Sequence, residues 1–270
     1  MTPPRRGTSA LDRIDVDEVV SIARAAGRAI MSVYQAPFDV QIKDDASPLT
    51  AADRAAHEII ETSLRRAYPD IPLLSEEGPQ VPFDERRRWT RFWLVDPLDG
   101  TKEFVQRNGE FTVNIALVEG QAPVLGVIGL PTRDRTYRGD RHRGAAVQDG
   151  SGSPVRIAVR AHDLTGGRRV VVSRSHRSAA TDALLARLDV AETIACGGSS
   201  KFCAIAEGRA DLYPRLGPTM EWDTAAGQAI VEAAGGAVLD LSGHPIVYNK
   251  PILTNPPFVV EAQRAPSCLS

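Results

Sequence analysis

The most informative stretch of the chain is Asp96-Pro97-Leu98-Asp99-Gly100-Thr101, which directly follows the apolar run Trp93-Leu94-Val95. Pro97 fixes its φ angle and Gly100 permits a positive φ, so the chain can turn sharply where the apolar strand ends. Such a turn aims two carboxylates and a backbone carbonyl at one point. Hard oxygens of this kind are the ligands that Mg²⁺ prefers. The alternative is a strand-to-helix turn whose acids only cap the following helix.

Three further acidic positions could serve the same chemistry. Glu76 and its acidic neighbour follow the short apolar segment Leu73-Leu74-Ser75, Asp223 lies where a helix is expected to begin, and Asp53 stands three residues after Thr50. Each has a structural alternative. The Glu76 pair could be a solvated loop, Asp223 could compensate a helix dipole, and Asp53 has the spacing of a capping box.

The pattern of apolar residues indicates a mixed α and β fold. Apolar side chains at three- and four-residue steps predict a first helix over Val16–Val33, and Thr50 predicts the N-cap of a second. The full set of predicted helices is Val16–Val33, Ala51–Ala67, Ala179–Leu188, Ser199–Glu207 and Thr224–Ala234. Predicted strands are Val40–Ile42, Phe92–Val95, Phe111–Val118, Val124–Leu130, Val170–Val172 and Ala210–Tyr213.

The segment Gly150-Ser151-Gly152-Ser153-Pro154 is the best linker candidate, because small flexible residues followed by proline resist both helix and central strand. It divides the chain into two predicted lobes, residues 1–152 and 153–270, each containing strands and helices. The arginine-rich stretch Arg133–Arg143 lies just before this division. It predicts a solvated hairpin, with contact to an anionic ligand as the alternative.

Composition bounds the function. The 270 residues carry 32 Lys and Arg against 34 Asp and Glu, a net charge of −2, so the overall balance does not attract nucleic acid or an anionic membrane. No apolar run approaches the roughly 20 residues of a membrane span, and the basic N-terminus lacks the apolar core of a signal peptide. Three cysteines, Cys196, Cys203 and Cys268, exclude a disulfide scaffold. We expect reduced thiols in a cytoplasmic protein, which leaves room for peripheral association with the inner membrane face.

Taken together, the acidic stretches resemble those of a known family. Four segments are similar to motifs of the inositol monophosphatase superfamily of Mg²⁺-dependent, lithium-sensitive phosphatases. They are 75–77 (Ser-Glu-Glu), 93–104, 109–118 and 221–227 (Glu-Trp-Asp-Thr-Ala-Ala-Gly). The likeness extends from the first helix to about Phe258. It implies a five-layered αβαβα sandwich of the inositol monophosphatase and fructose-1,6-bisphosphatase type, classed as α+β or α/β.

The resemblance also implies roles for individual residues. Two or three Mg²⁺ ions would be held by one set of residues, Glu76, Asp96, the carbonyl of Leu98, Asp99 and Asp223. Gly100 and Thr101 would bind the scissile phosphate, with Asp99 and Asp223 also reaching the substrate. Glu76 and Thr101 would orient the attacking water, and Asp53 would support Thr101 from behind. This agrees with the physical expectation that bound metal ions lower the pKa of water and neutralise phosphate charge.

Within the superfamily the chain looks most like the CysQ-type 3′(2′),5′-bisphosphate nucleotidases, which remove the 3′-phosphate of 3′-phosphoadenosine 5′-phosphate in sulfate assimilation. The segments that carry this likeness are 99–104, 201–208 and 212–219. Arg215 lies where inositol monophosphatases carry a glutamate that accepts hydrogen bonds from sugar hydroxyls. A guanidinium there favours a second anionic group instead. The alternative is that Arg215 makes a surface ion pair.

One segment departs from the family pattern. Relatives read Gly-Ser-Ser-Leu-Lys where this chain has Gly197-Gly198-Ser199-Ser200-Lys201, so either Ser200 replaces the leucine or the turn is one residue shorter. Ser199 and Lys201 are candidates to bind the nucleotide. A glycine-rich segment that opens a helix exposes unpaired N–H groups to an anion, although a plain helix start is equally compatible with it.

Three hypotheses follow. The first is a Mg²⁺-dependent phosphatase that acts on a small phosphorylated nucleotide, as a monomer or homodimer, with neither nucleic acid nor a transmembrane segment involved. The second is an inositol monophosphatase or a broader sugar phosphatase that acts on fructose 1,6-bisphosphate. The third is a non-catalytic nucleotide or metal binder of the same fold. The histidines show no metal spacing, and His176 is the one candidate among them for a substrate contact.

The substitution Arg215→Glu tests the role of the guanidinium. If Arg215 receives a second phosphate, the change lowers activity on the bisphosphate nucleotide more than on inositol phosphate, because a carboxylate repels that group. Steady-state phosphate release on both substrates measures this ratio. Equal losses on the two substrates would count against a role in selecting substrate.

Overall fold

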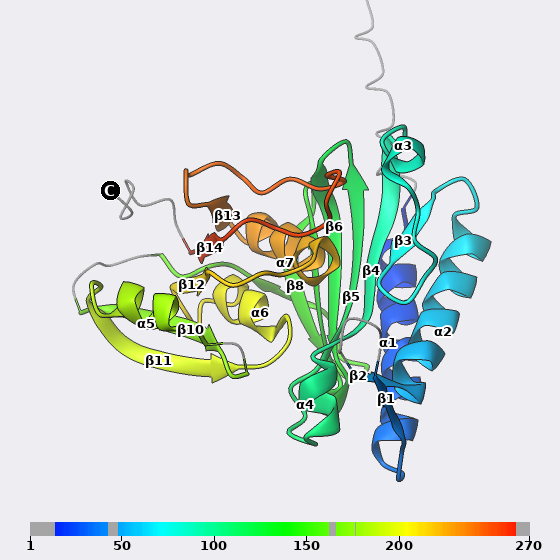
Figure 1. Cartoon of the computed structure of the whole chain (residues 1–270), viewed down its shortest axis with the longest axis horizontal. Helices are drawn as coiled ribbons and strands as arrows, with labels where there is room; N and C mark the ends of the chain where they lie inside the picture. The colour runs from blue at the N-terminus through cyan, green and yellow to red at the C-terminus, as the bar shows by residue number, and fades with distance from the viewer. Residues whose placement is uncertain (1–13, 43–47, 162–165, 176, 263–270) are drawn as a thin grey trace, which may run out of the picture.

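The computed structural model describes residues 14–42, 48–161, 166–175 and 177–262, so Cys268 and His176 lie outside the described residues. Its helices are α1 (Val16–Tyr34), α2 (Ala51–Ala67), α3 (Phe83–Arg86), α4 (Thr101–Val105), α5 (Ala179–Leu185), α6 (Ser200–Ala206) and α7 (Glu221–Ala233), with a 3₁₀ turn at Pro131–Arg133. Two sheets separate these helices into layers (Figure 1).

The larger sheet has seven strands in sequence order, and all its neighbours are antiparallel except the first pair. They are β3 (Leu73–Ser75), β4 (Arg91–Asp99), β5 (Thr112–Glu119), β6 (Ala122–Leu130), β7 (Arg135–Asp140), β8 (Gly144–Asp149) and β9 (Val155–Ile157). The smaller sheet has the order β11 (Val190–Cys196), β10 (Arg168–Ser173), β12 (Leu212–Arg215), β14 (Phe258–Glu261), β13 (Ala237–Asp240). A short antiparallel pair, β1 (Val40–Ile42) and β2 (Pro48–Thr50), precedes α2.

The apolar runs of the central strands follow from burial on both faces. Along β4, Trp93 and Val95 pack under α1 and α2, whereas Phe92 and Leu94 face the opposite side, toward α6 and α7. Successive strand residues point to opposite faces, so a strand covered on both sides must be apolar at every position. The sequence therefore shows continuous apolar runs where a half-exposed strand would alternate.

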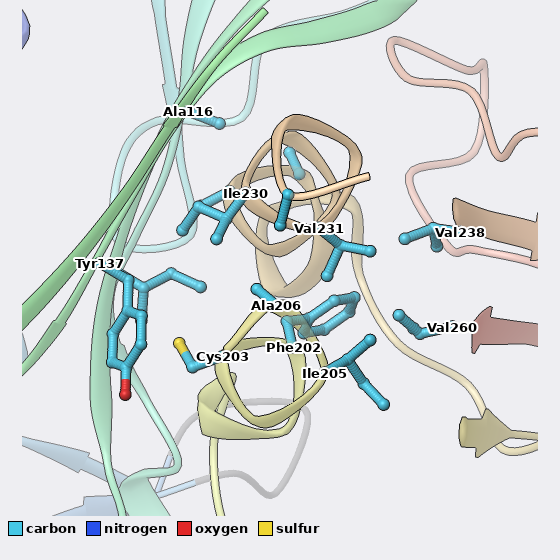
Figure 2. Packing of buried hydrophobic residues seen from close by; sticks show 14 of the residues in the cluster. Ala116, Tyr137, Phe202, Cys203, Ile205, Ala206, Ile230, Val231, Val238 and Val260 are labelled. Atoms are coloured by element: carbon cyan, nitrogen blue, oxygen red, sulfur yellow. The ribbon is translucent and has the colours of Figure 1, made fainter. Parts of the chain in front are cut away.

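The smaller sheet is covered in the same way. Val171 of β10 packs with the α6 and α7 layer, and its neighbours Val170 and Val172 pack with Leu185 of α5 on the outer face. Figure 2 shows the middle layer from close by, with Tyr137 on the large sheet and Val260 on the small one. The order of layers is α1 and α2, seven-stranded sheet, α6 and α7, five-stranded sheet, α5. The expected αβαβα architecture is confirmed.

Helix α7 lies so close to the large sheet that two strand positions have no room for a side chain. A Cβ at Gly126 of β6 would lie 2.3 Å from the carbonyl oxygen of Ala226, and one at Gly139 of β7 would lie 2.4 Å from the Cα of Ile230. Both neighbours are helix backbone atoms, which cannot move aside alone. This contact sets the height of α7 above the sheet, and with it the position of Asp223 near the helix start.

Several boundaries differ from those expected. Helix α7 begins at Glu221, three residues earlier than predicted, and α5 ends at Leu185 rather than Leu188. The Arg133–Arg143 hairpin is present as β7 and β8, but it is only partly solvated, because Thr136, Tyr137 and Asp140 are buried. Arg135 pairs with Asp149 and Glu207, and Arg138 with Asp17. The strands that were not predicted are β2, β3, β8, β9, β11, β13 and β14.

The division into residues 1–152 and 153–270 stays a prediction. Strand β9 lies beyond it and extends the large sheet to Ile157 by pairing with β8. Cys196 and Cys203 are free thiols, in agreement with the expected absence of a disulfide scaffold. Among the described residues, no helix has both the length and the apolar character that a membrane span requires.

The substitution Gly126→Ala tests the close approach of α7. We expect it to destabilise the fold by about 1–3 kcal/mol, because the new methyl group overlaps helix backbone and forces the two layers apart. Thermal unfolding measures the loss, and Gly129→Ala in the same strand is the matched control, since its Cβ would make ordinary contacts at 3.7 and 3.9 Å. Equal stability of the two variants would contradict the packing argument.

Candidate active site

Strand β4 does not stop at Val95 as expected but continues to Asp99. Its pairing with β5 shifts register between Asp96 and Asp99, which marks a bulge. Proline lacks the N–H that a regular ladder needs, so Pro97 is tolerated at this irregularity. Gly100 then adopts φ +90°, confirming the expected left-handed position, and α4 begins at Thr101.

Three carboxylates converge where β3, β4 and α7 meet. One oxygen from each of Glu76, Asp96 and Asp223 lies within 4.8 Å of the others, and Asp96 is 1% exposed. The backbone N–H of Leu98 donates to Oδ1 of Asp96 at 3.0 Å, which fixes that side chain in the bulge. The cluster therefore joins residues that are 147 positions apart in sequence, from Glu76 to Asp223.

The electrostatics of this cluster call for a cation. Burial raises the pKa of Asp96 well above its ordinary value, and repulsion from Glu76, Asp99 and Asp223 raises it further. Burial likewise raises the pKa of Asp223, with Asp99 and Glu76 adding to the effect. Like charges that share a buried site favour protonation unless a positive charge compensates them. Oxygen donors in this arrangement fit a hard divalent cation.

Asp53 uses its two oxygens for two purposes. Oδ2 accepts hydrogen bonds from the backbone N–H and the hydroxyl of Thr50, both at 2.7 Å, and so closes the capping box of α2. Oδ1 lies 3.3 Å from the hydroxyl of Thr101, which also lies 3.2 Å from the carbonyl oxygen of Leu98. The capping interpretation of Asp53 is confirmed, and because capping leaves its second oxygen available, the predicted support of Thr101 stays open.

Asp223 behaves in the same manner. Its Oδ2 accepts a hydrogen bond from the backbone N–H of Met220 at 2.8 Å, which caps α7. Asp223 also belongs to the acidic cluster. An acid at this position compensates the helix dipole as well.

Asp99 lies beside the three converging acids and is held from the other half of the chain. The hydroxyl of Ser199 donates to its Oδ2 at 2.7 Å and also lies 2.8 Å from the carbonyl oxygen of Asp223. Thr112 and Asn114 of β5 donate to the same Asp99 oxygen at 3.3 and 3.5 Å. Ser199 thus contacts two of the predicted metal-binding residues, where it was expected to contact the nucleotide.

A cleft of about 700 Å³ opens over these groups. Its size lies within the roughly 300–1,000 Å³ typical of ligand pockets. Every predicted site residue except Asp53 lines it: Glu76, Asp96, Leu98, Asp99, Gly100, Thr101, Ser199, Lys201, Arg215 and Asp223. Asp53 lies behind Thr101, as expected. The sequence interpretation missed Lys102 and Arg177, which bring further positive charge to the lining.

Some missed residues had a signal in the sequence. Lys102 and Glu103 belong to the 93–104 segment that resembles the family motif. Arg177 directly follows His176, the histidine that was a candidate for a substrate contact. Nothing local distinguishes Arg177 from other surface arginines. Its Nε also lies 2.5 Å from Oδ1 of Asp182.

The residues of segment 197–201, which departs from the family pattern, lie in different places. Gly198, Ser199 and Lys201 line the cleft, whereas the hydroxyl of Ser200 donates to the carbonyl oxygen of Gly197 at 2.6 Å. Lys201 is buried, and its ammonium group donates to the carbonyl oxygen of Gly198. Burial lowers the pKa of Lys201, while the neighbouring Asp99 opposes the change.

Arg215 reaches the cleft from the end of β12. Its Nη2 donates to the carbonyl oxygen of Pro218 at 2.8 Å, which orients the guanidinium on the lining. Its charge lowers the pKa of Asp223, although burial outweighs this effect. Acids and cations thus occupy one cleft together.

A model of the inositol monophosphatase family matches residues 12–265 of the chain. The chain belongs to the inositol monophosphatase family. Membership agrees with the two-sheet fold and with the acids that meet where β3, β4 and α7 come together.

Relatives within this family include proteins of stated activity. The chain is 48% identical over 248 residues to 3′(2′),5′-bisphosphate nucleotidase CysQ from Escherichia coli and from Shigella flexneri, covering 91% of this chain and 98% of theirs. Among solved structures it is similar to CysQ from Bacteroides thetaiotaomicron, described as a bacterial member of the family, with 43% identity and a TM-score of 0.81. That likeness covers 92% of this chain and 97% of the other.

The substitution Asp96→Asn tests the repulsion in the metal-free cluster. The pKa of Asp96 is higher in the folded protein than in the unfolded chain, where it is about 4. The folded protein is therefore most stable with Asp96 protonated, and it loses stability as the pH rises through the folded-state pKa. A neutral amide avoids this loss. We therefore expect Asp96→Asn to raise the melting temperature of EDTA-treated protein at neutral pH and to reduce its stabilisation by added divalent cation.

Asp211→Asn is the control for this measurement. Burial alone would raise the pKa of Asp211, but hydrogen bonds from Arg169 outweigh it and lower that pKa. The stability that the Asp211 carboxylate contributes is therefore lost as the pH falls. Replacing Asp211 should lower the melting temperature at neutral pH. A melting temperature of Asp96→Asn below that of the wild type in EDTA at neutral pH would contradict the repulsion.

Proposed function

We propose that the chain is a Mg²⁺-dependent 3′(2′),5′-bisphosphate nucleotidase. It would hydrolyse the 3′-phosphate of 3′-phosphoadenosine 5′-phosphate to give AMP and phosphate, in sulfate assimilation and nucleotide turnover. The observation that carries the proposal is the cleft that holds Glu76, Asp96 and Asp223 together with cationic side chains. The identity of 48% to nucleotidases of that name supports the choice of substrate.

The metal-binding residues would be Glu76, Asp96, the carbonyl of Leu98, Asp99 and Asp223, for two or three Mg²⁺ ions. When bound, these ions supply positive charge to the phosphoryl oxygens and lower the pKa of water. Most of these residues belong to the proposed lobe 1–152, and Asp223 belongs to the proposed lobe 153–270. The fold that holds α7 against the large sheet is what keeps the two parts of the set in reach.

The chain's own groups would orient the reactants. Glu76 accepts a proton from the attacking water, Thr101 holds that water in line with the phosphate, and Asp53 fixes the Thr101 hydroxyl through the contact at 3.3 Å. Gly100, in its left-handed conformation, lets the backbone approach the phosphate closely. Attack is direct, so no phosphorylated side chain forms.

Positive charge in the cleft suits a doubly phosphorylated substrate. Arg215, Lys201, Lys102 and Arg177 all line it. Guanidinium groups bind phosphate in two parallel hydrogen bonds, so Arg215 is our candidate for the second phosphate. The geometry of Ser199 favours support of Asp99 over direct contact with the nucleotide. The proposal includes a cytoplasmic location and a monomeric or dimeric state.

Phosphate release on three substrates separates the candidate functions. We expect Mg²⁺-dependent turnover of 3′-phosphoadenosine 5′-phosphate to exceed that of inositol monophosphate and fructose 1,6-bisphosphate. A higher kcat/KM on a sugar phosphate would favour the broader phosphatase instead. Absence of Mg²⁺-dependent turnover on all three would indicate a non-catalytic binder.

Neighbouring glutamates offer a matched pair of variants for the same assay. Glu76→Gln should lower kcat by about 10²–10⁴-fold, the range for loss of a general base. Glu77→Gln, whose side chain does not line the cleft, should change kcat less than tenfold. Similar losses for both variants would contradict the role of Glu76.

A further inference from the structure

A turn from the second half of the chain supports a proposed metal-binding residue in the first half. Ser199 donates to Oδ2 of Asp99 and accepts a hydrogen bond from Nδ2 of Asn114 at 2.9 Å. Ser199 is 2% exposed and follows Gly197 and Gly198, which leave β11. The orientation of the Asp99 carboxylate therefore depends on where this turn lies.

The turn contacts the loop before β5 directly. A Cβ at Gly197 would lie 2.6 Å from the carbonyl oxygen of Glu110, and one at Gly198 would lie 3.2 Å from the same oxygen. Gly198 also has a positive φ of +50°, which favours glycine. The two backbones thus touch without intervening side chains, so a shift of either one displaces the other.

An ion pair holds the two backbones together. Nε and Nη2 of Arg174 donate to the two carboxylate oxygens of Glu110 at 2.7 and 2.8 Å, a two-point contact. The backbone N–H of Gly197 donates to the same carboxylate. The hydrogen bonds from Arg174, with the bond from Gly197 adding to them, lower the pKa of Glu110. Arg174 also binds the end of β11, through Nη2 to the carbonyl oxygen of Ala195 at 2.9 Å and its N–H to that of Cys196 at 3.1 Å.

The next residue makes a second connection. The hydroxyl of Ser175 donates to Oε1 of Glu103 at 2.5 Å. Glu103 lies in the first turn of α4, the helix that begins at Thr101. The end of β10 is therefore tied both to the loop beside the 197–199 turn and to the helix that carries Thr101.

We propose that Arg174 and Glu110 are positioning residues, a latch that keeps the 197–199 turn seated so that Ser199 orients Asp99 toward the bound cation. The proposal rests on the proposed function, because it takes Asp99 to be a metal ligand. The side chains of Arg174 and Glu110 are 46% and 18% exposed. Ion pairs this exposed contribute little to stability, so a purely structural pair would leave cation binding unchanged.

Charge reversal tests the latch. The variants are R174E, E110R and the double variant R174E/E110R, with the neutral Arg174→Met as a milder change. Calorimetric titration of the substrate-free protein with Mg²⁺ and with Mn²⁺ measures cation affinity independently of activity. We expect each single reversal to weaken affinity about 10–100-fold, the usual effect of losing a residue that orients a metal ligand, with little change in melting temperature. The double reversal should recover part of the affinity, because it restores the ion pair but not the bonds to the Gly197 N–H and the Ala195 carbonyl oxygen.

The cross-strand pair Arg91 and Glu119 provides the control. It joins β4 to β5 at 2.5 Å, at the opposite end of β4 from Asp99. R91E, E119R and their double variant should leave cation affinity within about twofold of the wild type, because this half-buried pair lies at the far end of β4 and acts only on local stability.

The outcomes separate the latch from the proposed function. If the wild type binds the cation and R174E binds it with unchanged affinity, the latch alone is overturned. The same holds if R174E loses affinity and the double reversal recovers none of it. A wild-type protein that binds neither cation would overturn the metal-dependent function and the latch together.

Discussion

The convergence of three carboxylates, one of them fully buried, is the constraint on which the rest of this structure depends. Glu76, Asp96 and Asp223 converge within 4.8 Å. Burial raises the pKa of Asp96 and of Asp223, and repulsion from the neighbouring acids raises both further. Left to themselves, such groups separate or take up protons. They stay together because each is fixed by backbone: β3 ends before Glu76, the β4 bulge holds Asp96, and the start of α7 holds Asp223. The layered core therefore holds like charges together at a place where a divalent cation would compensate them.

Two carboxylates that cap helices also lie at the candidate site. Asp53 caps α2 with one oxygen and faces Thr101 with the other, and Asp223 caps α7 while belonging to the acidic cluster. A carboxylate has two oxygens and about four lone-pair directions, so neither use excludes the other. Each acid lies in the first turn of its helix, so the regular helix backbone fixes its position. The capping roles expected for Asp53 and Asp223 are confirmed, and their roles in the chemistry stay predictions.

Much of the fold was predictable because burial of a strand or helix face leaves a local pattern of apolar residues in the sequence. Trp93 and its neighbours form a continuous apolar run since both faces of β4 are covered, and the spacing of apolar residues gave α1 to within one residue at its end. Short strands were less visible. Strands β13 and β14 have only four residues each, too few to show a period, and their pairing partners are distant in sequence. The extension of β4 to Asp99 was missed because a bulge lets a strand pass through proline.

The sequence by itself determined which chemistry is available: the acid after β3, the acids at the end of β4, the acid at the start of α7 and the family to which the chain belongs. Only the tertiary structure decided how these groups are held. It assigned Ser199 to Asp99 and Ser200 to the turn itself, brought Arg177 to the cleft, and paired Arg174 with Glu110 across 64 residues. The physical reason is that residue type and local spacing set what a side chain can do, whereas a contact between distant segments exists only after the layers have packed.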